Sequence, residues 1–132
     1  MSAYVDTSAL YAVMDRDDGN HKRAGKIWNE LLSGEEIPVV SNYVILETAA
    51  LVQRRLGMSA VKVLFNDIVP VFAVEWITID DHRSAVSAIL AAGRRGLSLT
   101  DCASFELMRR LGLDTVFTFD RHFKEQGFSV IP

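Results

Sequence analysis

The fold of this chain is decided by a short stretch close to its start, Ala3-Tyr4-Val5-Asp6-Thr7-Ser8. Its apolar residues 3–5 predict a strand, Asp6 ends that strand, and residues 8–14 predict a helix. A similar unit stands near the other end, where residues 115–119 predict a strand that Asp120 closes. Strands that pass directly into helices predict a mainly parallel sheet with helices on both of its faces. We therefore expect a layered α/β fold.

The region between these two units continues the alternation of strands and helices. Further strands are predicted over residues 37–40, 75–79 and 128–131. Helices are predicted over residues 21–32, 42–56, 59–68, 80–92, 99–111 and 121–126. Gly57 is expected to end the helix before it, and Ser59 to cap the helix after it.

Composition is typical of a globular protein of one domain. The chain has 132 residues, of which 49% are hydrophobic, and no segment resembles a linker or a repeat. We therefore expect one domain over residues 1–132. The single cysteine, Cys102, excludes an internal disulfide and fits a reducing cytoplasm. No signal peptide and no membrane span is recognisable, so we expect a cytoplasmic protein.

Four acidic residues occupy positions where a carboxylate is unexpected, at strand ends, in an apolar run or at a helix start: Asp6, Glu47, Asp101 and Asp120. In a parallel sheet with crossover helices, the carboxyl ends of strands and the loops that enter helices share one edge. Two carboxylates about 4 Å apart repel by roughly 4 kcal/mol at an effective dielectric near 20. A divalent cation relieves this repulsion and can activate water against a phosphodiester. The four acids are therefore a candidate metal site, and Thr7 or Ser8 could bond to a metal-bound water.

Each acid also has a simpler explanation. Asp6 and Asp120 could each cap the helix that follows, and Asp101 could form a capping box with Ser98. Glu47 is harder to explain, because its helical neighbours are mostly apolar, although a side chain that reaches solvent stays open. The four simple explanations together are less plausible than one shared site.

The basic residues and histidines give a weaker signal. A net charge of −3 argues against nonspecific binding of polyanions, but bound cations would offset the acids locally. His122 could touch a phosphate, or it could be an ordinary surface histidine. The candidate RNA contacts are Arg94, Arg95, Arg121 and His122.

Four short segments, in this order along the chain, resemble those of PIN-domain ribonucleases, in particular the VapC type of bacterial toxin. They are Val5-Asp6-Thr7-Ser8-Ala9-Leu10, Ile45-Leu46-Glu47-Thr48, Leu97-Ser98-Leu99-Thr100-Asp101 and Phe117-Thr118-Phe119-Asp120-Arg121-His122-Phe123. The resemblance implies a three-layer α/β/α fold with a five-stranded parallel sheet. It also implies that Asp6, Glu47, Asp101 and Asp120 bind Mg²⁺ or Mn²⁺ for the endonucleolytic cleavage of RNA. Some members carry a further acid shortly after the fourth, whereas here Arg121 and His122 follow, which leaves open one or two resident ions.

The resemblance further implies a cognate antitoxin as protein partner. The helix over residues 42–56 is apolar nearly all round, and residues 59–74 add more apolar surface, so we expect a homodimer and a groove for an antitoxin helix. A catalytically silent PIN-like module that binds protein or RNA is the main alternative. A phosphatase similar to haloacid dehalogenases ranks lower, because it needs a second Asp two residues after Asp6, where this chain has Ser8.

Overall fold

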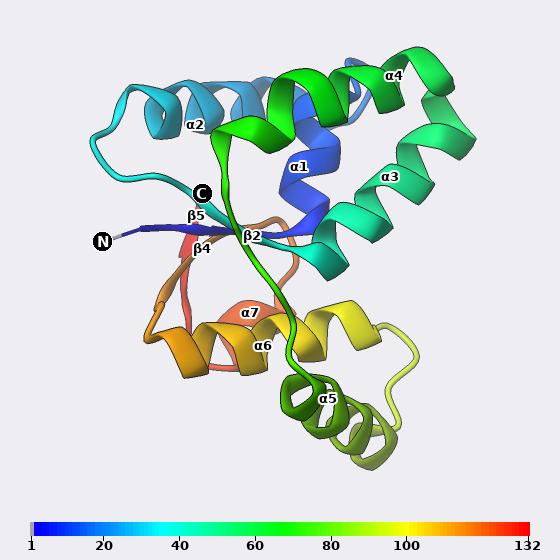
Figure 1. Ribbon diagram of the computed structural model, residues 1–132, viewed down its shortest axis with the longest axis vertical. Helices are drawn as coiled ribbons and strands as arrows, with labels where there is room; N and C mark the ends of the chain where they lie inside the picture. The colour runs from blue at the N-terminus through cyan, green and yellow to red at the C-terminus, as the bar shows by residue number, and fades with distance from the viewer. Residues whose placement is uncertain (1) are drawn as a thin grey trace.

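The computed structural model describes residues 2–132, and its centre is a five-stranded sheet (Figure 1). The strands are β1 (Tyr4–Val5), β2 (Val39–Ser41), β3 (Ala73–Glu75), β4 (Thr115–Phe117) and β5 (Ser129–Ile131). They lie in the order β3-β2-β1-β4-β5, and every neighbouring pair is parallel. The predicted parallel sheet of five strands is confirmed.

Helices cover both faces of the sheet and give three layers (Figure 1). One side carries α1 (Thr7–Met14), α2 (His21–Ser33), α3 (Asn42–Leu56) and α4 (Met58–Val63). The other carries α5 (Ile79–Ala92), α6 (Leu99–Leu111) and α7 (His122–Glu125). No helix within residues 2–132 combines the length and the apolar character that crossing a bilayer requires.

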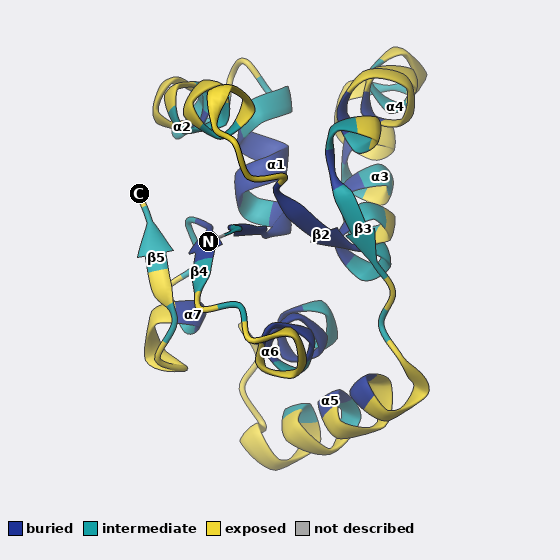
Figure 2. Ribbon diagram, turned by 60° about the vertical axis from the view of Figure 1, so that its left-hand side comes forward, coloured by how far each residue is buried: buried dark blue, intermediate teal, exposed yellow. Residues whose placement is uncertain are grey.

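The hydrophobic core lies on both faces of the central strands. Tyr4, Val40, Val116 and Phe117 have no exposed surface, and they belong to a contiguous cluster that includes inward faces of α1, α3 and α6. Figure 2 shows the burial concentrated at the sheet and at the helix faces turned toward it, while α5 is largely exposed. Burial on both faces is expected of a parallel sheet between two helical layers.

Local capping explains where the helices begin. Ser41 caps α3, since its Oγ accepts the Val44 N–H at 3.1 Å. The predicted cap at Ser59 is wrong, because α4 begins one residue earlier, after Gly57 with φ of 92°. This helix also ends earlier than predicted, and continues as a π-helical turn over Leu64–Ile68 and a 3₁₀ turn over Val69–Val71. Pro70 in the last turn cannot donate a backbone hydrogen bond to continue the α-helix.

The third strand is displaced from its predicted position. The predicted strand over residues 75–79 is wrong, because β3 is Ala73–Glu75 and Thr78 already caps α5. Thr78 Oγ1 accepts the Asp81 N–H, and the Asp81 carboxylate accepts the Thr78 N–H. This capping box begins the helix where β-propensity alone favours a strand.

The chain order places a topological switch at the middle of the sheet. From β1 the chain builds outward through β2 to β3, and it then crosses by α5 and α6 to β4, on the other side of β1. The connections that leave β1 and β4 therefore diverge, which is where open parallel sheets bind ligands. Asp6 follows β1 and Asp120 follows β4 at this position.

Candidate metal centre

Asp6 is buried at the carboxyl end of β1 and caps α1. The residue is only 2% exposed, and its Oδ2 accepts hydrogen bonds from Ser8 Oγ and Thr118 Oγ1, both at 2.9 Å. The other oxygen, Oδ1, is buried without a hydrogen-bond partner. Burial raises the pKa of Asp6 to about 6, against the opposing effect of the bonds from Ser8 and Thr118, and the charge of Asp120 adds to the rise.

Asp101 approaches the same point from the first turn of α6. Its Oδ2 accepts the Ser98 N–H at 3.0 Å, and its own N–H donates to Ser98 Oγ at 3.0 Å. Burial and then the charge of Asp6 raise the pKa of Asp101 to about 7, although the bonds from Ser98 oppose the rise. The capping box that explained Asp101 in the sequence is therefore present, and it holds the carboxylate beside a second acid.

Asp120 and His122 complete the group. Ligand atoms of Asp101, Asp120 and His122 lie within 4.8 Å of one another. Asp120 Oδ1 accepts the backbone N–H of His122 at 2.9 Å. The ring Nδ1 of His122 also lies 2.6 Å from this oxygen, a contact that is an ion pair when the imidazole is protonated, although it does not have the geometry of a hydrogen bond. His122 is only 12% exposed, so the surface explanation for this residue is wrong.

The donor set fits a hard divalent cation. Asp6 and Asp101 are buried, the charge of Asp6 raises the pKa of Asp101, the charge of Asp120 raises the pKa of both, and Asp6 Oδ1 lacks any donor. An unpaired acceptor in a buried site costs about 1–3 kcal/mol. A cation bound by carboxylate oxygens would offset both costs, and Mg²⁺ and Mn²⁺ accept such ligands.

Glu47 lies beside this group rather than within it. The structure places it on α3, partly exposed, on the wall of a cleft that Leu99 and Thr100 of α6 also line. Among residues 2–132 it has no hydrogen bond or ion pair, and it does not belong to the close group of Asp101, Asp120 and His122. Most of its neighbours on this wall are apolar, as the sequence indicated, and the side chain is only partly buried, so the open alternative of a side chain that reaches solvent is supported.

The hydroxyl groups near Asp6 have different environments. Ser8 Oγ donates to Asp6 Oδ2 and accepts the Phe119 N–H at 3.0 Å, so it connects α1 to the segment after β4. Thr7 Oγ1 is buried without a partner. That Thr7 or Ser8 bonds to a metal-bound water stays a prediction.

Sequence reasoning missed Thr118 as a site residue. Its hydroxyl donates to Asp6 Oδ2 and accepts the Asp120 N–H at 2.9 Å, so one side chain joins two of the acids. The signal was a hydroxyl residue at the end of an otherwise apolar strand, in Val116-Phe117-Thr118. A polar group that is only 1% exposed requires such partners.

A second layer of hydrogen bonds lies below the acids. The Tyr4 hydroxyl donates to Ser41 Oγ at 2.9 Å and lies 2.7 Å from Ser104 Oγ, and all three residues are buried. This network joins β1 to the start of α3 and to α6. It therefore fixes the helices that carry Glu47 and Asp101 to the central strand.

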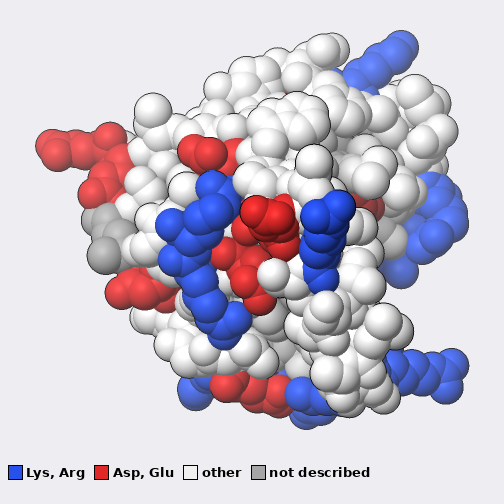
Figure 3. Space-filling model, turned by 60° about the horizontal axis from the view of Figure 1, so that its bottom comes forward, with Lys and Arg blue, Asp and Glu red and all other residues white. Residues whose placement is uncertain are grey.

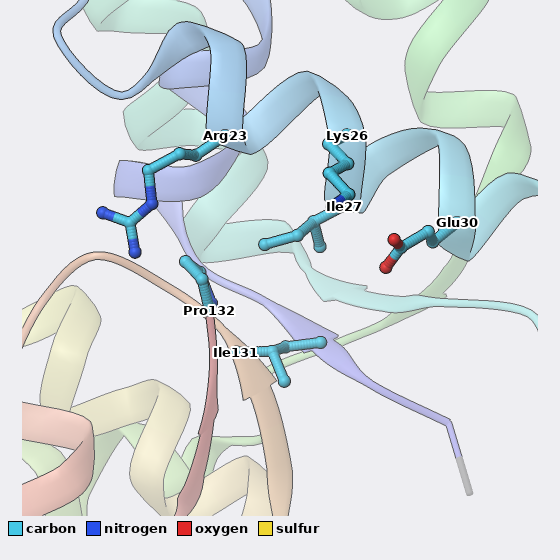
Figure 4. Close-up of a pocket in the computed structure, with 6 residues that line it drawn as sticks. All are labelled: Arg23, Lys26, Ile27, Glu30, Ile131 and Pro132. Carbon is cyan, nitrogen blue, oxygen red and sulfur yellow. The ribbon is translucent and has the colours of Figure 1, made fainter.

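Basic side chains lie around the acids rather than among them. In Figure 3 a group of acidic side chains occupies a hollow with basic side chains on either side. Arg94, Arg95 and Arg121 are exposed, and Arg94 pairs with Glu125 at 2.8 Å. A separate concavity of about 370 Å³ lies between α2 and the end of β5, and none of the four acids lines it (Figure 4).

Comparison with known proteins gives a consistent result. Residues 3–129 match the family model described as PIN domain. The 23S rRNA-specific endonuclease VapC20 of Mycobacterium tuberculosis is 32% identical over 126 residues, which cover 95% of this chain and 94% of that protein. The crystal structure of that VapC20, described as a Sarcin-Ricin loop cleaving toxin, matches at 31% identity with a TM-score of 0.84 and covers 96% of both chains. FitAcB from Neisseria gonorrhoeae, at 18% identity and a TM-score of 0.72 over 98% of this chain and 96% of that one, shares the fold.

Proposed function

This chain belongs to the PIN-domain family, and from that membership we propose that it is a metal-dependent endoribonuclease, the toxin of a toxin–antitoxin pair. The observation that carries the proposal is the close group of Asp101, Asp120 and His122, with the buried carboxylate of Asp6 electrostatically coupled to both of these aspartates. No hydrophobic core needs three carboxylates coupled in this way. A silent PIN-like module would need none of them.

We propose that Asp6, Asp101 and Asp120 hold a Mg²⁺ or Mn²⁺ ion. When bound, such an ion lowers the pKa of a water molecule and stabilises charge on the phosphodiester. Ser8 and Thr118 orient the Asp6 carboxylate, because both donate to its Oδ2 and leave Oδ1 free. Ser98 orients Asp101 in the same way. The protein thus fixes its acids before the cation or the RNA arrives, which is the expected design of a metal site.

We also assign Glu47 to the site, at the rim of the cleft. Its side chain is unpaired and its three rotatable bonds let it turn toward Thr100 and the acids. This placement favours one firmly held ion at the three aspartates, with Glu47 available to a second ion that enters with the phosphate.

For the substrate we propose a structured loop of ribosomal RNA. The relative VapC20 is described as cleaving the Sarcin-Ricin loop of 23S rRNA, and the resemblance to it extends over nearly the whole chain. Arg94, Arg95 and Arg121 are proposed contacts for the phosphates that flank the cut, since they are exposed near Asp120 and His122. Phosphate contacts of this kind position an RNA without reading its sequence.

For protein partners we propose an antitoxin and a second copy of this chain. An apolar groove of about 620 Å³ lies between α3, the turns after α4 and the edge strand β3. Leu46 is 70% exposed and Trp76 is 69% exposed at this groove. Large apolar side chains exposed together usually mark an interface.

We further propose that residues 1–132 form one domain that works in the cytoplasm. The match to the family over residues 3–129, the one sheet and the contiguous core support a single domain. The lone cysteine, Cys102, is buried and free, which fits a reducing compartment.

The test is cleavage of a defined RNA by the purified chain. Intact ribosomes and a short transcript of the sarcin–ricin loop are incubated with protein in Mg²⁺ or Mn²⁺, with EDTA, and with Asp6→Asn. We expect specific cuts only with the wild-type chain and a metal, because Asn keeps the hydrogen bonds of Asp6 but removes the charge. Binding of the RNA without any cut would reject the nuclease and favour the silent module. Cuts that persist in Asp6→Asn would show that the cleavage does not depend on the proposed metal site.

A further inference from the structure

We propose that His122 is a ligand of the metal, so that the centre contains one nitrogen donor among carboxylate oxygens and prefers Mn²⁺ to Mg²⁺. This inference rests on the proposed function, and it concerns a residue that follows the fourth acid, Asp120, by two positions.

The first argument is the position of the imidazole. His122 supplies a ligand atom within 4.8 Å of ligand atoms of Asp101 and Asp120. Its side chain is 12% exposed, and its buried Nδ1 has one close contact, Asp120 Oδ1 at 2.6 Å. This contact is an ion pair when the ring is protonated, whereas a neutral ring has a nitrogen lone pair that can bind a cation beside Asp120.

The buried carboxylate of Asp6 gives a second, independent observation, because it lies outside this group but interacts electrostatically with two of its members. Asp6 is 98% buried, given its 2% exposure, and its Oδ1 has no partner. The charge of Asp6 acts on Asp101, which belongs to the group with His122. The unpaired oxygen of Asp6 and the imidazole of His122 therefore both belong to residues that interact with Asp101 and Asp120.

The segment that carries His122 is held in place by three contacts. The backbone N–H of His122 donates to Asp120 at 2.9 Å, which fixes the start of α7 to that acid. Phe123, with no exposed surface, packs edge-to-face on Phe105 of α6 with centroids 4.9 Å apart. A β-carbon added to Gly96 would lie 3.8 Å from Cε1 of His122, so the loop before α6 runs beside the ring.

The chemistry of the donor set gives the consequence. Mg²⁺ prefers oxygen ligands and octahedral geometry, whereas imidazole suits transition metals. One nitrogen donor therefore raises the affinity for Mn²⁺ relative to that for Mg²⁺. An aspartate at position 122 would give an all-oxygen set and remove the difference.

The test uses the full, untagged chain with Mn²⁺ alone, in the absence of RNA. Pulsed electron paramagnetic resonance detects nitrogen coupled to bound Mn²⁺, and calorimetry gives the Kd for Mn²⁺ and for Mg²⁺. The variants are His122→Ala and His122→Asp, with His82→Ala as the matched control, because His82 is an exposed histidine on α5. Circular dichroism and Tm confirm that each variant is folded.

We expect nitrogen coupling in the wild type and in His82→Ala, and none in the two His122 variants. The Kd for Mn²⁺ should rise about tenfold to a hundredfold in His122→Ala. In His122→Asp the ratio of the two affinities should shift toward Mg²⁺ by at least about tenfold. Nitrogen coupling that is absent from the wild type with Mn²⁺ bound, or that survives in His122→Ala, would overturn the assignment.

RNA cleavage in Mg²⁺ is measured in parallel to separate this inference from the proposed function. Asp6-dependent cleavage without nitrogen coupling would leave the nuclease standing and reject the histidine ligand. Nitrogen coupling without any cleavage would support the ligand and reject the nuclease.

Discussion

At the scale of single residues, Asp101 shows that capping a helix and serving a site are compatible. Its Oδ2 satisfies the Ser98 N–H at the start of α6, while its charge interacts with Asp6 and Asp120. The capping box orients the carboxylate of Asp101, and this orientation places it beside Asp120 and His122. Simple and functional explanations of an acid in a first helical turn therefore cannot be separated from sequence alone.

The raised pKa values predict how the stability of the metal-free chain depends on pH. The pKa is about 6 for Asp6 and about 7 for Asp101, both above 3.8, so the folded chain keeps protons that the unfolded chain has already released. Stability is therefore expected to fall as pH rises from 5 to 7.5, by at least about 1 kcal/mol, because one pKa unit corresponds to about 1.4 kcal/mol. Chemical denaturation at the two pH values in EDTA measures the change.

The control for this pH effect is Asp101→Asn, which removes one of the two titrating groups and leaves the histidines unchanged. The fall in stability between pH 5 and 7.5 should become smaller in this variant. Mg²⁺ should raise the Tm of the wild type more at pH 7.5 than at pH 5, since protons compete with the cation. A slope that is the same in both proteins would contradict the raised pKa of Asp101.

Thr118 gives a second prediction at the residue scale. Thr118→Val removes the bond to Asp6 and leaves the Asp120 N–H without its acceptor, so we expect a stability loss of about 1–3 kcal/mol. Metal affinity should fall about tenfold to a hundredfold, because Asp6 loses a group that orients it. Calorimetry with Mn²⁺ and urea denaturation measure the two effects. Thr118→Ser keeps the hydroxyl and should retain most of both quantities.

At the scale of elements, α5 and α6 both begin with a capping box, but only the box of α6 contains one of the candidate metal ligands. Each has a capping box with an aspartate at its third residue: Asp81 with Thr78 in α5, and Asp101 with Ser98 in α6. Asp81 pairs with Arg110 at 2.9 Å, which lowers its pKa and joins the two helices. The α5 box is therefore structural, and the α6 box also orients a site residue.

This pair of caps supplies a matched test. Ser98→Ala and Thr78→Ala should each cost about 1 kcal/mol of stability, because each removes the side-chain acceptor at a helix start. Only Ser98→Ala should also weaken Mn²⁺ binding and slow RNA cleavage, since it loosens Asp101. Equal loss of metal affinity in both variants would show that the effect is general destabilisation.

The elements that sequence predicted best are those with local signals. The helix over residues 99–111 has a cap, an apolar face and Gly112 with φ of 70° at its end, and it has the predicted bounds. The third strand was predicted too late because Ile77 and Ile79 are β-branched, although Thr78 and Asp81 start a helix there. Capping bonds outweigh the weaker preference of single residues for strands.

At the scale of the whole molecule, the apolar groove at the β3 edge of the sheet predicts association. We expect light scattering at micromolar concentration to give twice the chain mass of 14.7 kDa. Trp76→Glu should produce a monomer that still cleaves RNA, because Trp76 is 69% exposed at the groove. Leu90→Glu is the control, since Leu90 is 76% exposed on α5 and does not line the groove. A wild-type monomer under these conditions would contradict the homodimer.

The sequence by itself determined the layered α/β fold, the parallel sheet and the identity of the acids near its carboxyl edge. These features depend on hydrophobic periodicity and on residues at strand ends, which are local patterns. The order of the strands in the sheet and the topological switch between β1 and β4 are not local features of the sequence. They follow from the rules of crossover connections.

Only the tertiary structure decided which side chains actually meet. It joined Thr118 to both Asp6 and Asp120, brought His122 in from the surface, and left Glu47 at the rim of the cleft. These placements depend on the packing of α3, α6 and α7 against one another, over separations of up to about a hundred residues in the chain, as between Ser104 and Tyr4. Contacts at that range are set by how side chains fill space, which no short pattern in the sequence specifies.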